Sequence, residues 1–182
     1  MKSINLILMS ASIACITLMV NCGGTVSSGP SVSESTTSID FTGGSAMRDN
    51  ENEIETGFLG LTVQNVYVVD GNDKRISGSS IPLNSTFSIV FEGIKNFTLK
   101  KGKASPALSL QIIDDNQNTV INKIDLLTTQ AGGISEEDAS LLRATIEASG
   151  PITPGKYICS IQVTDKNNTD AAIASTWSFE VK

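Results

Sequence analysis

A strict alternation of apolar and polar residues near the end of the chain constrains the fold more than any other feature of the sequence. Over residues 156–164 every second side chain is apolar, and those between are polar except Ile158; the apolar set is Tyr157, Cys159, Ile161 and Val163. A two-residue period is that of a half-buried β-strand. Pro154-Gly155, which precedes the run, favours a sharp turn into it.

A second alternating run closes the sequence. Trp177, Phe179 and Val181 share one parity, polar side chains hold the other, and the polar segment 165–170 separates the two runs. Two such runs joined by a short polar turn predict an antiparallel hairpin.

Five more runs with strand character precede this hairpin. They cover residues 61–68, 87–91, 108–112, 119–124 and 142–148. We expect the first to carry a bulge at Gln64-Asn65, where its facing changes. Ser135, with an acidic residue three positions later, predicts one short helical turn. About seven short strands without a long helical period predict an all-β, two-sheet sandwich.

The residues of the first run also carry a family pattern. The string Pro154-Gly155-x-Tyr157-x-Cys159-x-Ile161-x-Val163-x-Asp165 resembles the penultimate strand of immunoglobulin-like domains, including the bacterial and PKD-type repeats. Tyr157 stands two residues before Cys159, as in the tyrosine corner of those domains. The resemblance implies an immunoglobulin-like sandwich, which we expect to span residues 58–182.

The chain departs from antibody domains in two respects. No earlier cysteine pairs with Cys159, and the tryptophan of the sequence, Trp177, lies on the last expected strand. The resemblance therefore implies the sandwich without antibody-type ancestry.

The N-terminal residues have the pattern of an export signal. Lys2 gives a positive start and an apolar run from Ile4 to Val20 follows. That run is short for a membrane span, which needs about 20 apolar residues, and no basic flank follows it. Leu18-Met19-Val20-Asn21, before Cys22, resembles the lipobox of bacterial lipoproteins, although Asn21 replaces the usual small residue. The looser lipoboxes of spirochaetes and the Bacteroides group accept such replacements.

This resemblance implies a signal peptide over residues 1–21 and a lipid-modified Cys22. The protein would then be anchored to a bacterial membrane in the cell envelope, on the periplasmic face or at the cell surface. Two alternatives remain at this point. Cys15, after Ala14, is disfavoured as the modified residue because cleavage there leaves Ile16 to Val20 on the mature protein. A simple secretory signal with a free cysteine is the other.

Residues 22–57 are expected to form a flexible tether between the anchor and the sandwich. The segment contains many Ser, Thr, Gly and acidic residues and few large apolar side chains. Such a composition does not bury enough apolar surface to fold by itself.

Composition excludes several kinds of chemistry. The sequence has no histidine, which excludes Ser-His and Cys-His nucleophile pairs and histidine-based zinc sites. A net charge of -6 argues against a nucleic-acid partner and against a protein that lies on anionic lipid through basic residues. The basic cluster Lys100-Lys101-Gly102-Lys103 is interpreted as a solvated turn or a charged edge. Cys159, on the core parity, is expected to be an unreactive apolar filler.

Acidic residues gather in three expected turns, at Asp70–Asp73, Asp114–Asn118 and Asp165–Asp170. Their spacing would suit calcium, yet no turn has the closing bidentate glutamate, and tight turns select Asp and Asn for structural reasons. We expect no metal, no cofactor and no catalytic residue. In the expected layout the first two turns share one end of the sandwich and the third lies at the other end.

The function predicted from the sequence is that of a membrane-anchored exported lipoprotein whose sandwich is a noncatalytic binding or envelope-organising module. Its partners would be the membrane, through Cys22, and a protein or glycan. Of the candidate ring platforms for a glycan, Tyr157 and Trp177 have core parity, which leaves Tyr67. The alternatives are an exported hydrolase using carboxylates or calcium, and a secreted carrier with an apolar pocket between its sheets.

Overall fold

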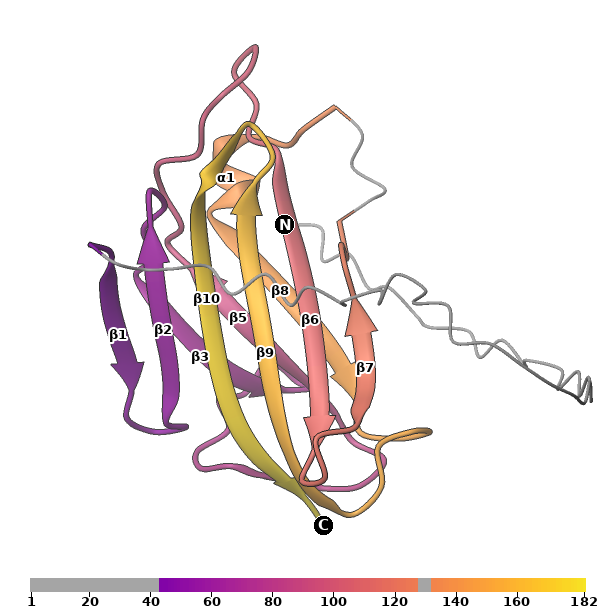
Figure 1. Ribbon diagram of the computed structural model, residues 1–182. Coiled ribbons are helices and arrows are strands. Elements are labelled where there is room, and N and C mark those ends of the chain that lie inside the picture. The colour runs from indigo at the N-terminus through magenta and orange to yellow at the C-terminus, as the bar shows by residue number, and fades with distance from the viewer. Residues whose placement is uncertain (1–42, 128–131) are drawn as a thin grey trace, which may run out of the picture. The chain divides into compact units, whose positions relative to one another are not determined.

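The computed structural model describes residues 43–127 and 132–182 of the chain (Figure 1). Its elements, in order, are β1 (Ser45–Asp49), β2 (Ile54–Leu59), β3 (Asn65–Asp70), β4 (Ser80–Ile81), β5 (Thr86–Glu92), β6 (Pro106–Asp114), β7 (Thr119–Lys123), α1 (Glu136–Ala139), β8 (Leu141–Glu147), β9 (Gly155–Asp165) and β10 (Asn168–Val181). Nearly all the regular structure in the described residues is therefore β-strand. No helix among them has the length and apolar content that crossing a membrane requires.

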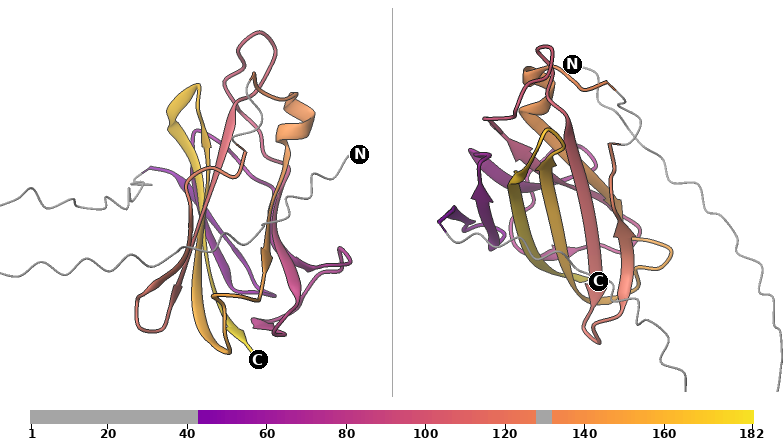
Figure 2. Two further views of the ribbon diagram at one scale, coloured as in Figure 1. Left: turned by 90° about the vertical axis from the view of Figure 1, so that its right-hand side faces the viewer. Right: turned by 45° about the horizontal axis from the view of Figure 1, so that its top comes forward.

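The strands form two sheets that face each other (Figures 1 and 2). The larger has the order β1-β2-β10-β9-β6-β7, with β4 pairing in parallel with the end of β10, and the smaller has the order β3-β5-β8. Strands β10-β9-β6-β7 opposite β3-β5-β8 reproduce the strand order of an immunoglobulin-like sandwich. The expected fold class is confirmed, and the β1–β2 hairpin extends it at β10.

Aromatic side chains join the two sheets at the centre of the core. Phe87 on β5 meets Trp177 and Phe179 on β10 edge to face, with ring centroids 5.8 and 5.5 Å apart. Trp177 stacks on Phe179 with ring centroids 4.8 Å apart, and Tyr157 of β9 also stacks on Phe179, with centroids 5.5 Å apart. Such arrangements add to the free energy gained by burying the rings. The last two strands are thus held to the opposite sheet by the residues that the alternation placed inward.

The predicted hairpin is confirmed, with Cys159 opposite Trp177 and Tyr157 opposite Phe179. The predicted helical turn is confirmed as α1. Ser135 caps it by accepting a hydrogen bond from the Asp138 amide at 3.0 Å.

The tyrosine corner implied by the family resemblance is present between β8 and β9. The Tyr157 hydroxyl donates to the carbonyl oxygen of Thr153 at 2.7 Å and accepts from the Thr153 amide at 3.0 Å. Its ring is 5% exposed. The side chain therefore pins the turn that leads into β9 to the core.

The expected boundary between tether and sandwich at residues 57 and 58 is wrong, because the sheet begins at Ser45. The signal was weak because one inward position of β2 is polar. Thr56 is buried, and its hydroxyl lies 2.8 Å from the Ser175 hydroxyl on β10. A satisfied hydroxyl pair in a core costs little, but it removes the apolar alternation. Residues 22–42 of the expected tether lie outside the described part.

The expected bulged strand over residues 61–68 is confirmed in its second half, as β3, and wrong in its first half. β2 ends at Leu59, and Gly60 turns the chain with φ of 71°, where a Cβ would lie 2.8 Å from the Cβ of Ala171. β3 starts only at Asn65. Leu61 and Val63 are buried in the connection between the two strands and not in a strand of their own. With β1, β2 and β4 added, the described part has ten strands where about seven were expected.

We predict that removing the Tyr157 hydroxyl destabilises the sandwich. Tyr157→Phe should lower the free energy of unfolding by about 1–2 kcal/mol, because the Thr153 amide and carbonyl lose their partner. Tyr157→Ala should lower it by about 3–5 kcal/mol, as large aromatic truncations do. Urea titration measures both, with Ser160→Ala on the exposed face of the same strand as the control. A Tyr157→Phe variant as stable as the native protein would contradict the assigned role of the corner.

Candidate functional site

The predicted lipidation site, Cys22, lies outside the described residues, as does the alternative, Cys15. The structure therefore gives neither of them a geometry, and the lipid anchor stays a prediction from the sequence.

Two of the acidic turns use their carboxylates to close the turn itself. The Asp70 carboxylate accepts from the amides of Lys74 at 3.0 Å and Asn72 at 2.9 Å, and these bonds lower its pKa. The Asp114 carboxylate accepts from the Asn118 side chain at 2.9 Å and the Asn118 amide at 2.8 Å, which lower its pKa in the same way. Both groups are therefore held as carboxylates by the backbone that they organise.

The third turn fastens a long loop to the end of the β9–β10 hairpin. Asp165 is 1% exposed, and its carboxylate accepts from the Asn167 amide at 2.9 Å and from the Thr98 amide at 2.7 Å. The side chain of Asn167 donates to the Thr98 carbonyl at 2.8 Å. Thr98 belongs to the connection between β5 and β6, so this aspartate has a structural role across 67 residues of sequence.

The three turns are arranged as the sequence predicted. Asp70 pairs with Phe87, which contacts the opposite sheet near Tyr157, and Tyr157 pairs with Asp114, so the first two turns share one end. Asp165 lies at the far end of β9. Within the described residues no three acidic or thiol side chains are placed to hold one metal ion.

The outer face of the larger sheet, which we call the open face, carries exposed side chains on its central strands. It consists of the outward residues Ser109, Gln111, Ile113, Ile158, Ser160, Gln162, Thr164, Ala174, Thr176 and Ser178 on β6, β9 and β10. Ser160 lies opposite Thr176, and Gln162 opposite Ala174. None of these side chains is ionisable, so the central part of three adjacent strands presents hydroxyl, amide and methyl groups to solvent. Charged residues border it: Lys156 and Glu180 continue the outward rows of β9 and β10, and Glu55 of β2 lies opposite Thr176.

The outer face of the smaller sheet differs because its own chain packs on part of it. Arg75 places its guanidinium 3.8 Å from the ring centre of Tyr67, and Asp73 pairs with Arg143 of β8 at 2.6 Å. Val90, which faces outward between these strands, is 1% exposed. The two outer faces are thus unequal, and the larger sheet carries the open one.

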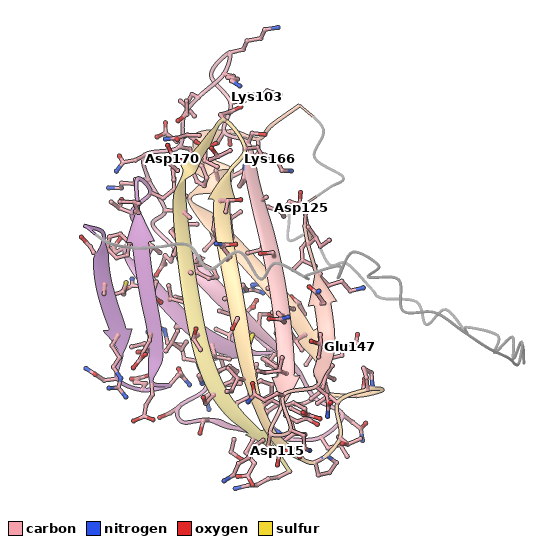
Figure 3. The ribbon with its side chains drawn as sticks, viewed as in Figure 1. Lys103, Asp115, Asp125, Glu147, Lys166 and Asp170 are labelled. Carbon is pink, nitrogen blue, oxygen red and sulfur yellow. The ribbon has the colours of Figure 1, made fainter. Side chains whose placement is uncertain are left out.

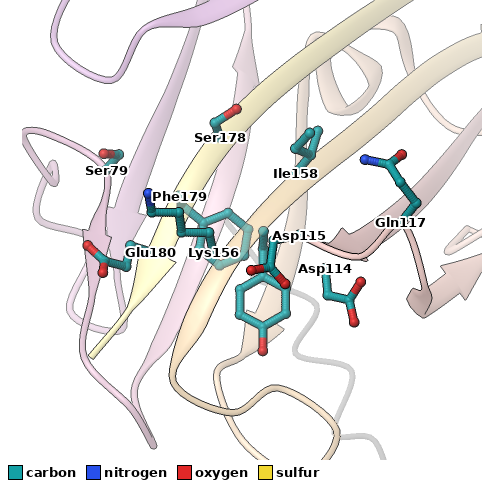
Figure 4. Close-up of a pocket in the computed structure, with 10 residues that line it drawn as sticks. Ser79, Asp114, Asp115, Gln117, Lys156, Ile158, Ser178, Phe179 and Glu180 are labelled. Carbon is teal, nitrogen blue, oxygen red and sulfur yellow. The ribbon is translucent and has the colours of Figure 1, made fainter.

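A hollow of about 390 Å³ lies at the end of the open face near the C-terminus (Figure 4). Ile158 and Ser178 line it together with Lys156, Asp115 and Glu180. The hollow opens on the outer face and not between the sheets, so it is not the internal apolar pocket that a carrier would need.

The carboxylates beside this hollow do not have the properties of an acid–base pair. Glu180 pairs with Lys182 at 3.0 Å, and the pKa of Asp114 is lowered by its turn. A general acid at neutral pH needs a raised pKa, which is the opposite direction. Nothing in this geometry favours the hydrolase alternative.

Cys159 has the properties of an unreactive core residue, as expected. It is completely buried, has no disulfide partner, and its burial raises the thiol pKa to about 12. Nearby, the indole Nε1 of Trp177 is buried without a hydrogen-bond partner. Neither group opens on the hollow or on the open face.

No family model matches the sequence, and no curated protein matches it. Among solved structures, the C-terminal domain of wzt resembles the chain with a TM-score of 0.47 at 10% identity, over 71% of this chain and 78% of that one. The PmoD soluble domain from Methylocystis sp. ATCC 49242 (Rockwell) has a TM-score of 0.38 at 12% identity, over 75% of this chain and 96% of that one. Likenesses at this level assign no activity to the chain.

We predict that calcium leaves the melting temperature unchanged. The turn carboxylates already accept amide donors, and a ligand that does not bind the native state cannot stabilise it. Calorimetry after chelation, with and without millimolar calcium, measures this, and magnesium serves as the control. A clear rise specific to calcium would contradict the structural role given to the turns.

We also predict that Cys159 does not react with thiol reagents in the native protein. A buried thiol with a raised pKa has almost no thiolate at pH 8. With the mature acylated protein, an aromatic disulfide reagent should release no coloured thiolate while the protein stays folded. In guanidinium it should release one equivalent, from Cys159. Rapid labelling without denaturant would mean that the strand opens locally.

Proposed function

We propose that this chain is an exported bacterial lipoprotein, anchored in the cell envelope by lipid chains on Cys22, whose sandwich acts as a noncatalytic binding or envelope-organising module. The lipobox-like residues before Cys22 support the anchor. More than one acyl chain gives stable membrane attachment. The periplasmic face and the cell surface are both compatible with this anchor.

The open face carries the proposal that the sandwich binds rather than catalyses. Its central part carries no ionisable group, and Lys156 and Glu180 lie at its end. The carboxylates at Asp70, Asp114 and Asp165 are engaged in turns. Hydroxyl and amide groups on a flat sheet suit hydrogen bonding to an uncharged glycan or to a polar protein surface. They supply no nucleophile, base or metal site.

The revised start of the sandwich at Ser45 shortens the spacer to residues 23–44. A flexible chain of this length would span about 25 Å on average, at about 5–6 Å times the square root of its length. The proposal therefore places the sandwich close to the membrane that holds it.

We predict that Cys22→Ala abolishes labelling by a clickable fatty acid and moves the protein out of the membrane fraction. Cys15→Ala is the matched control and should keep both, because Cys15 leaves with the signal peptide. Gel fluorescence and fractionation report the result. Unchanged labelling of Cys22→Ala, or loss of labelling in Cys15→Ala, would place the modified cysteine elsewhere.

A further inference from the structure

The connection between β5 and β6 ends in a stiff hairpin turn, Leu99–Lys103, which we call the lysine tip. Lys100 and Lys103 exchange backbone hydrogen bonds at 2.9 and 3.1 Å. Lys101 and Gly102 between them have φ of 53° and 73°, as in a type I′ turn. Lys100, Lys101 and Lys103 are all exposed. The tip extends beyond α1 and the β9–β10 turn, and Figure 3 shows Lys103 beyond Lys166 and Asp170.

The tip is held rigidly on the sandwich by the buried carboxylate of Asp165. That carboxylate and the Asn167 side chain bond both the amide and the carbonyl of Thr98, directly before the tip. The amide of Lys166 donates to the carbonyl of Ser105, two residues after the tip, at 2.9 Å. A rigid base presents the three lysines in a fixed direction, which reduces the entropy lost when they bind a surface.

The tip also carries an exposed apolar side chain. Among the large apolar residues of the described part, three are exposed: Leu99 at 41%, Ile124 at 85% and Leu141 at 46%. Leu141 begins β8 opposite the last residue of β5 and Ile124 follows β7, so of the three it is Leu99, within the tip, that lies beside the lysines. Lysines beside exposed apolar side chains are the composition of a surface that binds the lipid–water interface.

The first described strand begins in the half of the sandwich that carries the tip. Following the strand pairing across the sheet from Ser45 on β1 leads to Leu108 on β6. Leu108 is two residues from Pro106, where β6 begins after the lysine tip. The spacer that leads from Cys22 therefore joins the half of the sandwich that carries the tip, but at the edge strand β1, four strands across the sheet from β6, while the C-terminus and the hollow lie at the other end (Figure 1).

We propose that the lysine tip docks on the anionic headgroups of the membrane that holds the lipid anchor. This inference rests on the proposed anchor at Cys22. Each lysine near an anionic surface strengthens binding about fivefold, so the three in the tip contribute about 100-fold. Residues that the tether keeps close to the membrane meet the headgroups at high effective concentration.

The negative net charge of the chain does not oppose this contact. Charges interact over a screening length of about 8–10 Å in physiological salt, so the groups nearest the tip decide. Asp125 at this end pairs with Lys166 at 2.7 Å, and the Asp165 carboxylate is buried against amides. Asp170 and the α1 residues Glu136 to Asp138 are exposed at this end, but the tip extends past α1 and the β9–β10 turn, so its lysines lie outermost (Figure 1).

A fluorophore on the tip tests the contact in the mature acylated protein reconstituted into vesicles. Leu99→Cys provides the labelling position, because Cys22 is acylated and Cys159 is buried. Vesicles of phosphatidylcholine alone are compared with vesicles containing 30% phosphatidylglycerol, both doped with brominated lipid that quenches fluorescence on contact. Flotation of the same samples reports the anchor independently.

Two matched triple variants separate the tip from general electrostatics. The tip variant carries Lys100→Gln, Lys101→Asn and Lys103→Gln, with Asn chosen because it tolerates positive φ. The control variant carries Lys74→Gln, Lys156→Gln and Lys182→Gln at the opposite end. Equal denaturation midpoints confirm that both fold as the native protein does.

We expect flotation with both vesicle types, and quenching only with anionic vesicles, lost in the tip variant and at 0.5 M salt but kept in the control variant. Flotation with equal quenching on both vesicle types, or quenching that survives in the tip variant, overturns the docking and leaves the anchor standing. Failure to float with phosphatidylcholine vesicles overturns the proposed anchor, and the docking falls with it.

Discussion

The contact of Phe87 with Trp177 and Phe179 is the constraint on which the sandwich depends. It is the place where the central strand of the smaller sheet meets the last strand of the larger one. Strand β5 is buried on both faces, with Phe87 and Val90 at 0% and 1% exposure. The register of such a strand is strongly specified, because a slip of one residue would turn its inward side chains to the outer face. The tyrosine corner then fixes β9 relative to this contact.

The accuracy of the sequence-based expectations follows from how each strand is buried. β8, β9 and β10 were predicted correctly because their inward side chains are apolar and alternate with exposed polar ones. β2 was missed because Thr56 is satisfied by Ser175, a partner 119 residues away that no local pattern reveals. The strand over 61–68 was misplaced because Leu61 is buried in a connection. Burial alone, without the period, does not identify a strand.

Whether a candidate site could be predicted from the sequence likewise depends on whether local or distant residues form it. The role of the acidic turns was predictable because Asp70 and Asp114 bond amides within four residues of themselves. The open face was not, since it exists only because β6, β9 and β10 are neighbours, and chain order does not specify that pairing. The Asp165 clamp on Thr98 is likewise a contact between distant segments. Its sequence signal is that of an ordinary turn.

The lysine cluster was recognised in the sequence as a solvated turn or a charged edge, but the net charge argued against its contact with anionic lipid. Summed over the chain, 19 acidic residues outweigh 13 basic ones, and the sum favours no contact with anionic lipid. The fold removes Asp165 from that sum by burying it against amides and pairs Asp125 with Lys166. Within the described residues, the three lysines of the protruding turn form no ion pair with a carboxylate. Because the surface potential depends on nearby charges, an acidic protein can present a basic turn, and the proposed anchor would keep that turn within reach of the membrane.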